Sequence, residues 1–193
     1  MRPRVLVLLA SYNGEKYIRE QIDSVLEQKG DFDLLLRIRD DGSSDRTREV
    51  IRESIRQWGA ERIELVEGEN LGYNGNFFAL LDQAEGFDYY ALCDQDDIWL
   101  PGKIQAAMEA LSQGEGPALY SAISRMVDEN KRPLGLTRAR KRALTPANTL
   151  IQNICPGHNQ VLNEALLRLV QKPRDLSRIY VYDLWIANVA ALQ

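Results

Sequence analysis

Short apolar runs alternate with helical patterns of apolar residues from residue 5 to residue 123. Five of these runs have the length and composition of buried strands: residues 5–10, 34–38, 63–66, 89–93 and 118–123. Between successive runs, apolar residues recur at the three- and four-residue spacing of helices, as Ile18, Ile22 and Val25 do. The alternation predicts an α/β fold, with an open, mostly parallel central sheet flanked by helices on both faces.

Turn residues and helix caps separate these elements. Residues 43–45, SSD, are cap candidates for the second helix, and Pro101 suits the first turn of the fourth. The segment EGENLGYNGN, residues 67–76, is rich in turn residues and predicts a loop. The third helix is therefore expected to begin near Phe77.

The pattern is less regular beyond residue 124. Residues 131–142, KRPLGLTRARKR, include six basic residues and predict a loop or hairpin. Residues 162–170 and 183–192 have helical spacing, and the chain stops inside the second of these patterns without a cap or tail. We therefore expect one domain, residues 1–193, and consider that it is truncated at its C-terminus.

Composition disfavours several classes of protein. The net charge of −4 at pH 7 argues against nucleic acid as the main partner. Cys93 and Cys155 make no disulfide framework, which favours a reducing, cytoplasmic compartment. No stretch has the length of a transmembrane helix, and the apolar run at residues 5–10 is too short for the core of a signal peptide.

Small and acidic polar residues follow each of the first four predicted strands. These residues are ASYN at 10–13, DDGS at 40–43, ENLG at 69–72 and DQDD at 94–97. In open α/β sheets, ligands bind outside the carboxyl ends of the strands. Four such strand ends, two of them with acidic clusters, predict a binding site at this edge of the sheet.

Asp94 and Asp96 are candidates for holding a divalent cation. Side chains alternate along an extended chain, so these carboxylates are expected to share one face, with Gln95 opposite. Carboxylate oxygens suit Mg²⁺ or Mn²⁺, ions that leave ligand positions for substrate phosphates, and a cation would relieve the repulsion between the acids. The alternative is that an acid here, Asp97 in particular, caps the helix that begins near Pro101.

Other polar residues keep two readings open. Asp40 and Asp41 fit a turn with a helix cap, or an acceptor for hydrogen bonds from a nucleobase or ribose. His158 is the only histidine, which excludes a histidine-rich metal site; it lines a pocket or has a structural role. Cys93 could act as a nucleophile with His158 as its base, but its place at the end of an apolar strand favours an inert, buried thiol. The loop at residues 67–76 matches neither of the standard phosphate-binding motifs.

Four segments taken together resemble the signature segments of family 2 glycosyltransferases, the inverting enzymes of the Rossmann-like GT-A fold. They are LASYNGEKYIREQIDSVLEQ, RDDGSSDRT, NLGYNGNF and CDQDDIWLPGK, and they occur in this order. The last two look closest to the bacterial rhamnosyltransferase-like branch, which builds surface polysaccharides. The resemblance covers residues 4–125 well and residues 150–192 loosely.

The resemblance implies a role for particular residues. Asp41 would contact the nucleobase, Asp94 would lie near the ribose, and Asp96 would bind the Mg²⁺ or Mn²⁺ that bridges the diphosphate. Asp183, in the segment YDLW, would be the catalytic base, with Tyr182 in place of the Glu or His often found before it. The nucleotide-sugar-binding candidates together are Ala10, Tyr12, Asp41, Asn70, Gly72, Asn76, Asp94, Gly157 and His158.

The implied reaction is inverting transfer of rhamnose or another hexose from a nucleoside-diphosphate sugar, dTDP-rhamnose or a UDP-sugar, to a glycan or lipid-linked acceptor. Residues 1–97 would form the nucleotide-binding part, and residues 98–193 the acceptor- and sugar-binding part. Such a displacement needs a base and a cation but no protein nucleophile. Basic residues within 131–142 would attract an anionic membrane surface or a lipid-diphosphate acceptor, unless they form a solvated loop. We therefore expect a cytoplasmic protein, with peripheral contact to the inner face of the cell membrane.

Three alternatives remain at this point. A nucleotidyltransferase also uses acids and Mg²⁺ on an α/β sheet, but LASYNGEKY supplies no convincing Gly-rich basic loop. A phosphoacceptor receiver domain has its acids after the first and third strands, whereas here they follow the second and fourth. A truncated domain would bind the donor without transferring sugar.

Overall fold

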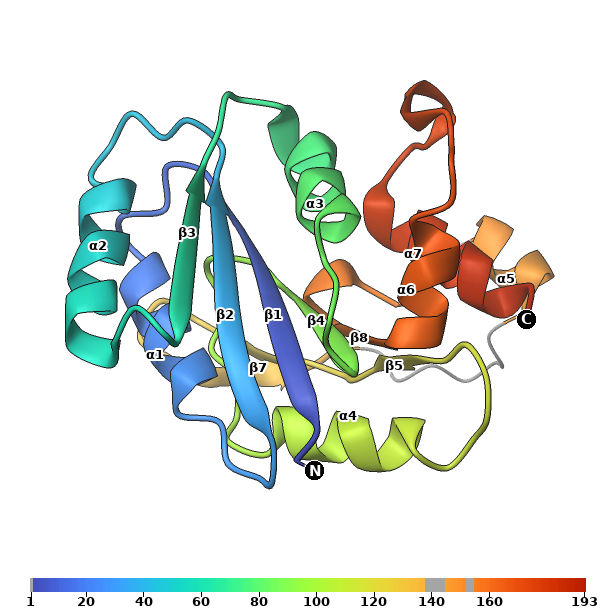
Figure 1. Ribbon diagram of the computed structural model, residues 1–193. Coiled ribbons are helices and arrows are strands. Elements are labelled where there is room, and N and C mark those ends of the chain that lie inside the picture. Colours follow the sequence, from blue (N-terminus) through green and yellow to red (C-terminus); the bar gives the residue numbers. More distant parts are fainter. Residues whose placement is uncertain (1, 138–144, 152–154) are drawn as a thin grey trace.

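The computed structural model describes residues 2–137, 145–151 and 155–193, and it is built around a six-stranded sheet (Figure 1). In spatial order the strands are β3 (Ile63–Glu67), β2 (Asp33–Asp40), β1 (Arg4–Ser11), β4 (Tyr89–Cys93), β8 (Gln160–Asn163) and β5 (Leu119–Ser121). The first four are mutually parallel, whereas β8 is antiparallel to both β4 and β5. The prediction of a mostly parallel α/β sheet is confirmed, and the carboxyl ends of four strands meet at one edge.

Helices cover both faces of this sheet (Figure 1). On one face lie α1 (Ile18–Leu26), α2 (Thr47–Trp58) and α4 (Lys103–Leu111); on the other lie α3 (Gly72–Asp82), α6 (Glu164–Val170) and α7 (Tyr182–Ala191). Alternate residues of β1 supply the two cores, with Val7 packed on the α1 face and Leu8 on the α3 face. A strand buried on both faces accounts for the unbroken apolar run at its sequence.

Smaller elements lie between β5 and α7. They are β6 (Arg125–Val127), β7 (Pro133–Leu136), α5 (Pro146–Ile151), and the 3₁₀ turns η1 (Gly157–Asn159) and η2 (Leu176–Arg178). The strands β6 and β7 pair as an antiparallel hairpin, which confirms the hairpin reading for the start of the basic segment. The rest of the basic segment, residues 138–142, lies outside the described residues. Of the helices in the described part of the chain, none combines the length and the apolar character needed to cross a bilayer.

The structure corrects the predicted end of the sheet. The expected fifth strand is only the three residues of β5, and its neighbour is β8, a strand that was not predicted. Residues 162 and 163 were expected to be helical, but they belong to β8, and α6 starts at Glu164. The Asn163 side chain caps that helix by accepting a hydrogen bond from Leu166 N at 3.0 Å. An apolar strand that runs directly into a capped helix has no turn residues to separate the two patterns.

Three helix starts also differ from the predictions. Helix α3 begins at Gly72, inside the expected loop, and α4 begins at Lys103, after Pro101. Helix α2 begins at Thr47, and of the predicted caps it is Asp45 that accepts a hydrogen bond from Thr47 N at 2.9 Å. Helix α3 starts early because its first backbone amides find an acceptor outside the helix, described below.

Candidate functional site

A cavity of about 510 Å³ opens at the carboxyl edge of the sheet, outside β1, β2 and β4. Eight predicted site residues line it: Ala10, Tyr12, Asp41, Asn70, Gly72, Asn76, Asp94 and Asp96. Ser11, Tyr73 and Gln95 line it as well and were not predicted. The residues that the sequence pattern placed at one edge of the sheet thus line one cavity there, where parallel strand ends gather in open α/β folds.

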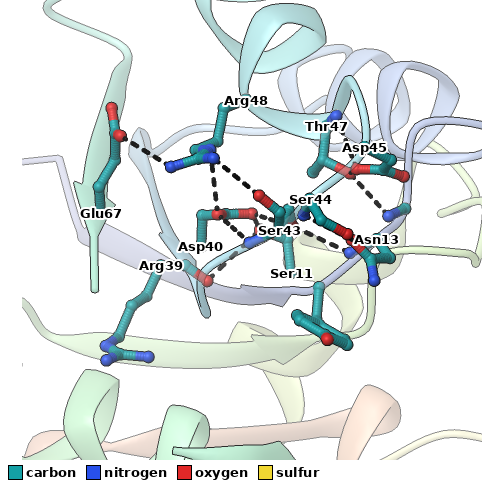
Figure 2. Close-up of polar contacts among 12 residues, drawn as sticks. Ser11, Asn13, Arg39, Asp40, Ser43, Ser44, Asp45, Thr47, Arg48 and Glu67 are labelled. Carbon is teal, nitrogen blue, oxygen red and sulfur yellow. Dashed lines mark hydrogen bonds and ion pairs between the residues drawn. The ribbon is translucent and has the colours of Figure 1, made fainter. Parts of the chain in front are cut away.

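Asp40, the last residue of β2, holds the following turn together (Figure 2). Its buried carboxylate accepts hydrogen bonds from Ser43 N at 2.9 Å, Ser43 Oγ at 2.5 Å and Ser11 Oγ at 3.1 Å. The Arg48 guanidinium lies 3.7 Å away and also approaches Glu67. With four polar neighbours, Asp40 has the structural role that the turn reading predicted.

Asp41, the second acid, is buried at the cavity wall and is also well supplied with donors. It accepts hydrogen bonds from Arg39 at 2.5 Å and from the backbone amides of Leu71 and Gly72 at 2.9 Å each. Asn76 in turn accepts a hydrogen bond from Arg39 at 2.8 Å. The backbone amides at the start of α3 have no partners within the helix, so a carboxylate there stabilises the helix end. Asp41 therefore fixes the start of α3 against the cavity.

Gln95 fastens the end of β4 to the end of β1. Its side chain accepts a hydrogen bond from Tyr12 N at 2.9 Å and donates one to Tyr12 O at 3.0 Å. A Cβ on Gly14 would lie 2.2 Å from Gln95 Oε1, so a larger residue at position 14 would displace the Gln95 side chain. Residues 94–97 follow the last strand residue, Cys93, in a turn. The expected alternation is wrong here, because Asp94, Gln95 and Asp96 all line the same cavity.

Asp94 has one carboxylate oxygen that the surrounding residues do not satisfy. Its Oδ1 atom is buried, and no hydrogen-bond partner is found for it among the described residues. Burial, followed by the nearby charges of Asp97 and Asp96, raises the pKa of Asp94 to about 7. A buried, unpaired carboxylate oxygen is costly unless a cation or donor satisfies it.

Asp94, Asp97 and His158 form the one group of potential metal ligands found in the described chain. One ligand atom from each lies within 4.8 Å of the others, and Asp94 Oδ2 is 3.8 Å from His158 Nδ1. Burial also raises the pKa of Asp97. Asp97 does not cap α4. In the first turn of that helix, Ile104 N instead donates a hydrogen bond to Gln28 Oε1 at 3.2 Å. Asp96 is exposed on the cavity wall and is not part of this group.

The backbone and ring of His158 are held by other residues. Its Nε2 atom is 3.1 Å from Ser124 Oγ, which leaves Nδ1 facing Asp94. Lys103 Nζ donates a hydrogen bond to the His158 carbonyl oxygen at 2.7 Å and lies over the Trp99 ring at 4.1 Å. Burial lowers the pKa of Lys103 to about 8. An oriented imidazole of this kind is typical of metal-ligating histidines.

Asp183 lies at the start of α7, close to the loop that carries His158. Its carboxylate is mostly buried and accepts hydrogen bonds from Gly157 N at 3.0 Å and Leu184 N at 2.7 Å. A Cβ on Gly157 would lie 1.9 Å from the hydroxyl of buried Tyr182, so only glycine fits beside that ring. The structure therefore brings the predicted Gly157 and Asp183 into contact with each other. Neither they nor His158 are among the residues that line the cavity.

Cys93 is a buried, unreactive thiol, as predicted. It accepts a hydrogen bond from Gln21 at 2.8 Å, and burial raises its pKa far above the usual range. It is not paired with His158, which faces Asp94 and Ser124 instead.

The sequence did not predict a metal-binding role for two of these three potential ligands, Asp97 and His158. Asp97 was read as a possible helix cap, and His158 as a pocket residue. The crowding of three acids in DQDD was a signal for the first, but no local pattern pointed to the second. Tyr73 was missed because the segment that contains it was read only as a loop.

Comparison with known proteins agrees with this geometry. The family described as "Glycosyl transferase family 2" matches residues 6–178. The dTDP-rhamnosyl transferase RfbG of Shigella flexneri is 38% identical over 106 residues, which cover 53% of this chain and 36% of that protein. The uncharacterized glycosyltransferase MJ1057 of Methanocaldococcus jannaschii is 26% identical over 194 residues, covering 98% of this chain and 66% of that protein. The match to RfbG thus spans about a third of that relative's length.

Solved structures share the fold. S. aureus TarS 1-349 superimposes with a TM-score of 0.73 at 22% identity, covering 98% of this chain and 55% of that one. The mannosyltransferase PcManGT from Pyrobaculum calidifontis, in complex with GDP-Man and Mn²⁺, has a TM-score of 0.65 at 23% identity, covering 87% of this chain and 46% of that one. The family match spans most of the chain, and the fold is that of these enzymes. The chain belongs to glycosyl transferase family 2.

Proposed function

We propose that this chain binds a nucleoside-diphosphate sugar and transfers its sugar, with inversion, to a glycan or lipid-linked acceptor of a surface polysaccharide. The observation that carries the proposal is the cavity of about 510 Å³, where Asp41 and Asp94 arrive from the ends of two strands. The similarity to RfbG makes dTDP-rhamnose the first donor to test. UDP-GlcNAc and GDP-mannose follow, since TarS and PcManGT were solved with them.

The residues that line the cavity suggest different roles for residues 1–97 and residues 98–193. Every residue that lines it lies between Ala10 and Asp96, which supports residues 1–97 as the donor-binding part. Residues 98–193 contribute His158 and Asp183 beside it, which supports a role in placing the sugar and the acceptor.

The residues at the end of β4 fit a divalent cation. Asp94 Oδ1 is buried without a partner, and two carboxylates with one imidazole suit Mn²⁺, or Mg²⁺ with additional water ligands. When bound, the cation would neutralise charge on the departing diphosphate. Asp94, Asp97 and His158 would hold it, and the family resemblance adds Asp96 as a ligand from the cavity wall.

Asp183 is the proposed base. Two backbone amides, from Gly157 and Leu184, orient its carboxylate. It would take the proton of the acceptor hydroxyl as the anomeric carbon is attacked, so a single displacement would invert the configuration there. The Asp183→Asn variant should bind the donor normally and lose transfer. Retained turnover in that variant would mean that another group is the base.

A thermal-shift screen of nucleotide sugars, with and without Mn²⁺, tests the function directly. We expect dTDP-rhamnose and Mn²⁺ together to raise the melting temperature more than either alone. No shift with any nucleotide sugar would overturn the proposal, and pyrophosphate release from a nucleoside triphosphate would favour a nucleotidyltransferase.

Calorimetry on three single variants identifies the metal ligands. Asp94→Asn and Asp97→Asn should each abolish Mn²⁺-dependent nucleotide binding, because each removes a carboxylate from the group within 4.8 Å. Asp96→Asn should do the same if the resemblance assigns it correctly. Unchanged affinity in one variant would remove that residue from the ligand set.

The hairpin of β6 and β7 supports peripheral contact with an anionic membrane. It exposes the apolar side chains of Met126, Val127, Leu134 and Leu136. Arg125 and Arg132 are exposed on the same hairpin, so apolar and basic groups are presented together. Flotation with vesicles that contain phosphatidylglycerol should recover the protein, and a Leu134→Ser, Leu136→Ser variant should float less. Equal recovery with neutral vesicles would contradict an electrostatic contribution.

A further inference from the structure

Helix α7, which carries Asp183 in its first turn, has no cap from its own sequence. The residue before it, Val181, has no side-chain oxygen, and no side-chain cap hydrogen bond is made there. The first backbone amides of a helix lack partners within the helix and need acceptors from elsewhere. The acceptor for Tyr182 N comes from another helix: it is Oδ1 of Asn74, at 3.1 Å, in the first turn of α3.

Asn74 makes a second contact with the same segment. Its Nδ2 atom donates a hydrogen bond to Tyr180 O at 2.8 Å. One side-chain amide therefore holds the backbone on both sides of Val181, where the chain enters α7. The two helices lie next to each other on one face of the sheet (Figure 1).

Aromatic contacts tie the same two helices together. The Tyr182 ring stacks on Phe77 with centroids 4.0 Å apart, and its hydroxyl is 3.2 Å from that of Tyr73. Tyr182 also abuts Gly157, whose amide donates to Asp183 Oδ2 at 3.0 Å. The position of the Asp183 carboxylate thus follows from the position of Tyr182, which α3 fixes.

The same end of α3 also lines the donor cavity. Gly72 and Tyr73 line the cavity, and the amides of Leu71 and Gly72 donate to Asp41. We propose that Asn74 is a positioning residue, which caps α7 from outside and aligns Asp183 with the donor cavity. This inference rests on the proposed function, in which Asp183 is the base.

The test compares Asn74→Ala with the conservative variant Asn74→Asp. Alanine removes both hydrogen bonds, whereas aspartate keeps an acceptor for Tyr182 N and adds a negative charge near a helix N-terminus, which is favourable. Gln113→Ala is the matched control, since this exposed amide bonds only to the carbonyl of Glu109 in its own helix region.

Two readouts are measured: hydrogen exchange of the amides at residues 182–185, and the turnover and donor affinity for hydrolysis of dTDP-rhamnose with Mn²⁺. Asn74→Ala should speed this exchange about 10-fold, as expected for loss of a cap. Turnover should fall about 10-fold while donor affinity stays within about 2-fold, because the donor contacts are unchanged. Asn74→Asp should restore most of the turnover, and Gln113→Ala should behave as the parent protein.

The double variant with Asp183→Asn separates this inference from the proposed function. If Asn74 acts through Asp183, adding Asn74→Ala to Asp183→Asn should cause no further loss of turnover. Normal turnover or normal exchange in Asn74→Ala would overturn the inference, whatever Asp183 does. Full turnover in Asp183→Asn would overturn the proposed base, while faster exchange in Asn74→Ala would still establish the cap.

Discussion

The two acidic clusters at the carboxyl edge of the sheet have similar sequences but opposite surroundings. At the end of β2, the carboxylates of Asp40 and Asp41 are saturated with hydrogen bonds from serine, arginine and backbone donors. After β4, Asp94 keeps a buried oxygen without a partner and lies near other acids. The first cluster builds the edge, and the second leaves room for a ligand. The donors around each acid therefore decide which carboxylates the fold satisfies and which keep an oxygen without a hydrogen-bond partner among the described residues.

The largest expected effect comes from breaking the first cluster. Asp40→Ala should lower the free energy of unfolding by about 3 kcal/mol, because it leaves Ser11, Ser43 and Arg48 without their shared buried acceptor. Chemical denaturation measures this loss. The exposed acid Asp31, which pairs only with Arg2, is the control, and Asp31→Ala should stay within about 0.5 kcal/mol. Equal losses of unfolding free energy in both variants would mean that the hydrogen bonds around Asp40 do not stabilise the fold.

In the absence of metal, removing the charge of Asp94 should have the opposite effect on the free energy of unfolding. Asp94→Asn relieves an unpaired buried charge and should leave stability unchanged or raise it by up to about 1 kcal/mol. The same variant should lose the Mn²⁺-dependent stabilisation, which for the parent is about 2.7 kcal/mol at a concentration about 100 times Kd. Melting temperatures with and without Mn²⁺ measure both effects. Glu85→Gln, at an exposed position, should respond to Mn²⁺ as the parent does.

The second cluster also depends on a distant loop, and Gly157→Ala tests that dependence. The added Cβ would meet the Tyr182 hydroxyl at 1.9 Å, and the required shift should cost about 2 kcal/mol of stability. Mn²⁺ affinity should fall as well, because His158 moves with its neighbour. A Cβ on Gly102 meets nothing within 4 Å, so Gly102→Ala is the matched control and should be neutral. If both variants keep parental Mn²⁺ affinity, the loop does not shape the ligand group.

The smallest effect is expected at the link between β1 and β4. Gln95→Ala removes the two hydrogen bonds to the Tyr12 backbone and should lower stability by about 1 kcal/mol. Nucleotide affinity should fall by a larger free energy than the stability does, since Tyr12 and Gln95 both line the cavity. Calorimetry with dTDP and Mn²⁺ checks this. Unaltered affinity would show that the link serves the fold alone.

The sequence predicted the part of the candidate site that follows from local pattern. Apolar runs marked the strands, and the rule that parallel strand ends share an edge then brought Ala10, Asp41 and Asp94 together. Local pattern could not show which acids would be satisfied. For Asp41 that depends on Arg39 and the amides at the start of α3, whereas Asp94 Oδ1 finds no hydrogen-bond partner among the described residues.

The position of His158 could not be predicted because it depends on strand direction. Strand β8 runs antiparallel to β4, with Val161 beside Ala91, so the residues just before β8 lie at the carboxyl edge of β4. A parallel strand in the same place would have delivered the residues after it instead. The apolar pattern of Val161 and Leu162 carries no information on this direction, and Leu162 was read as the start of a helix.

The order of these elements along the chain has a consequence for synthesis on the ribosome. All residues that line the cavity of about 510 Å³ have been synthesised once the chain reaches Asp96, and the strands around them need only βαβ units from the same part of the chain. Until residues 160–163 follow, β4 is an open edge strand, and His158 is not yet beside Asp94. A nascent chain would then form the cavity before it brings Asp94, Asp97 and His158 together. A chain stalled between these two points would offer an unprotected strand edge to chaperones or to other nascent chains.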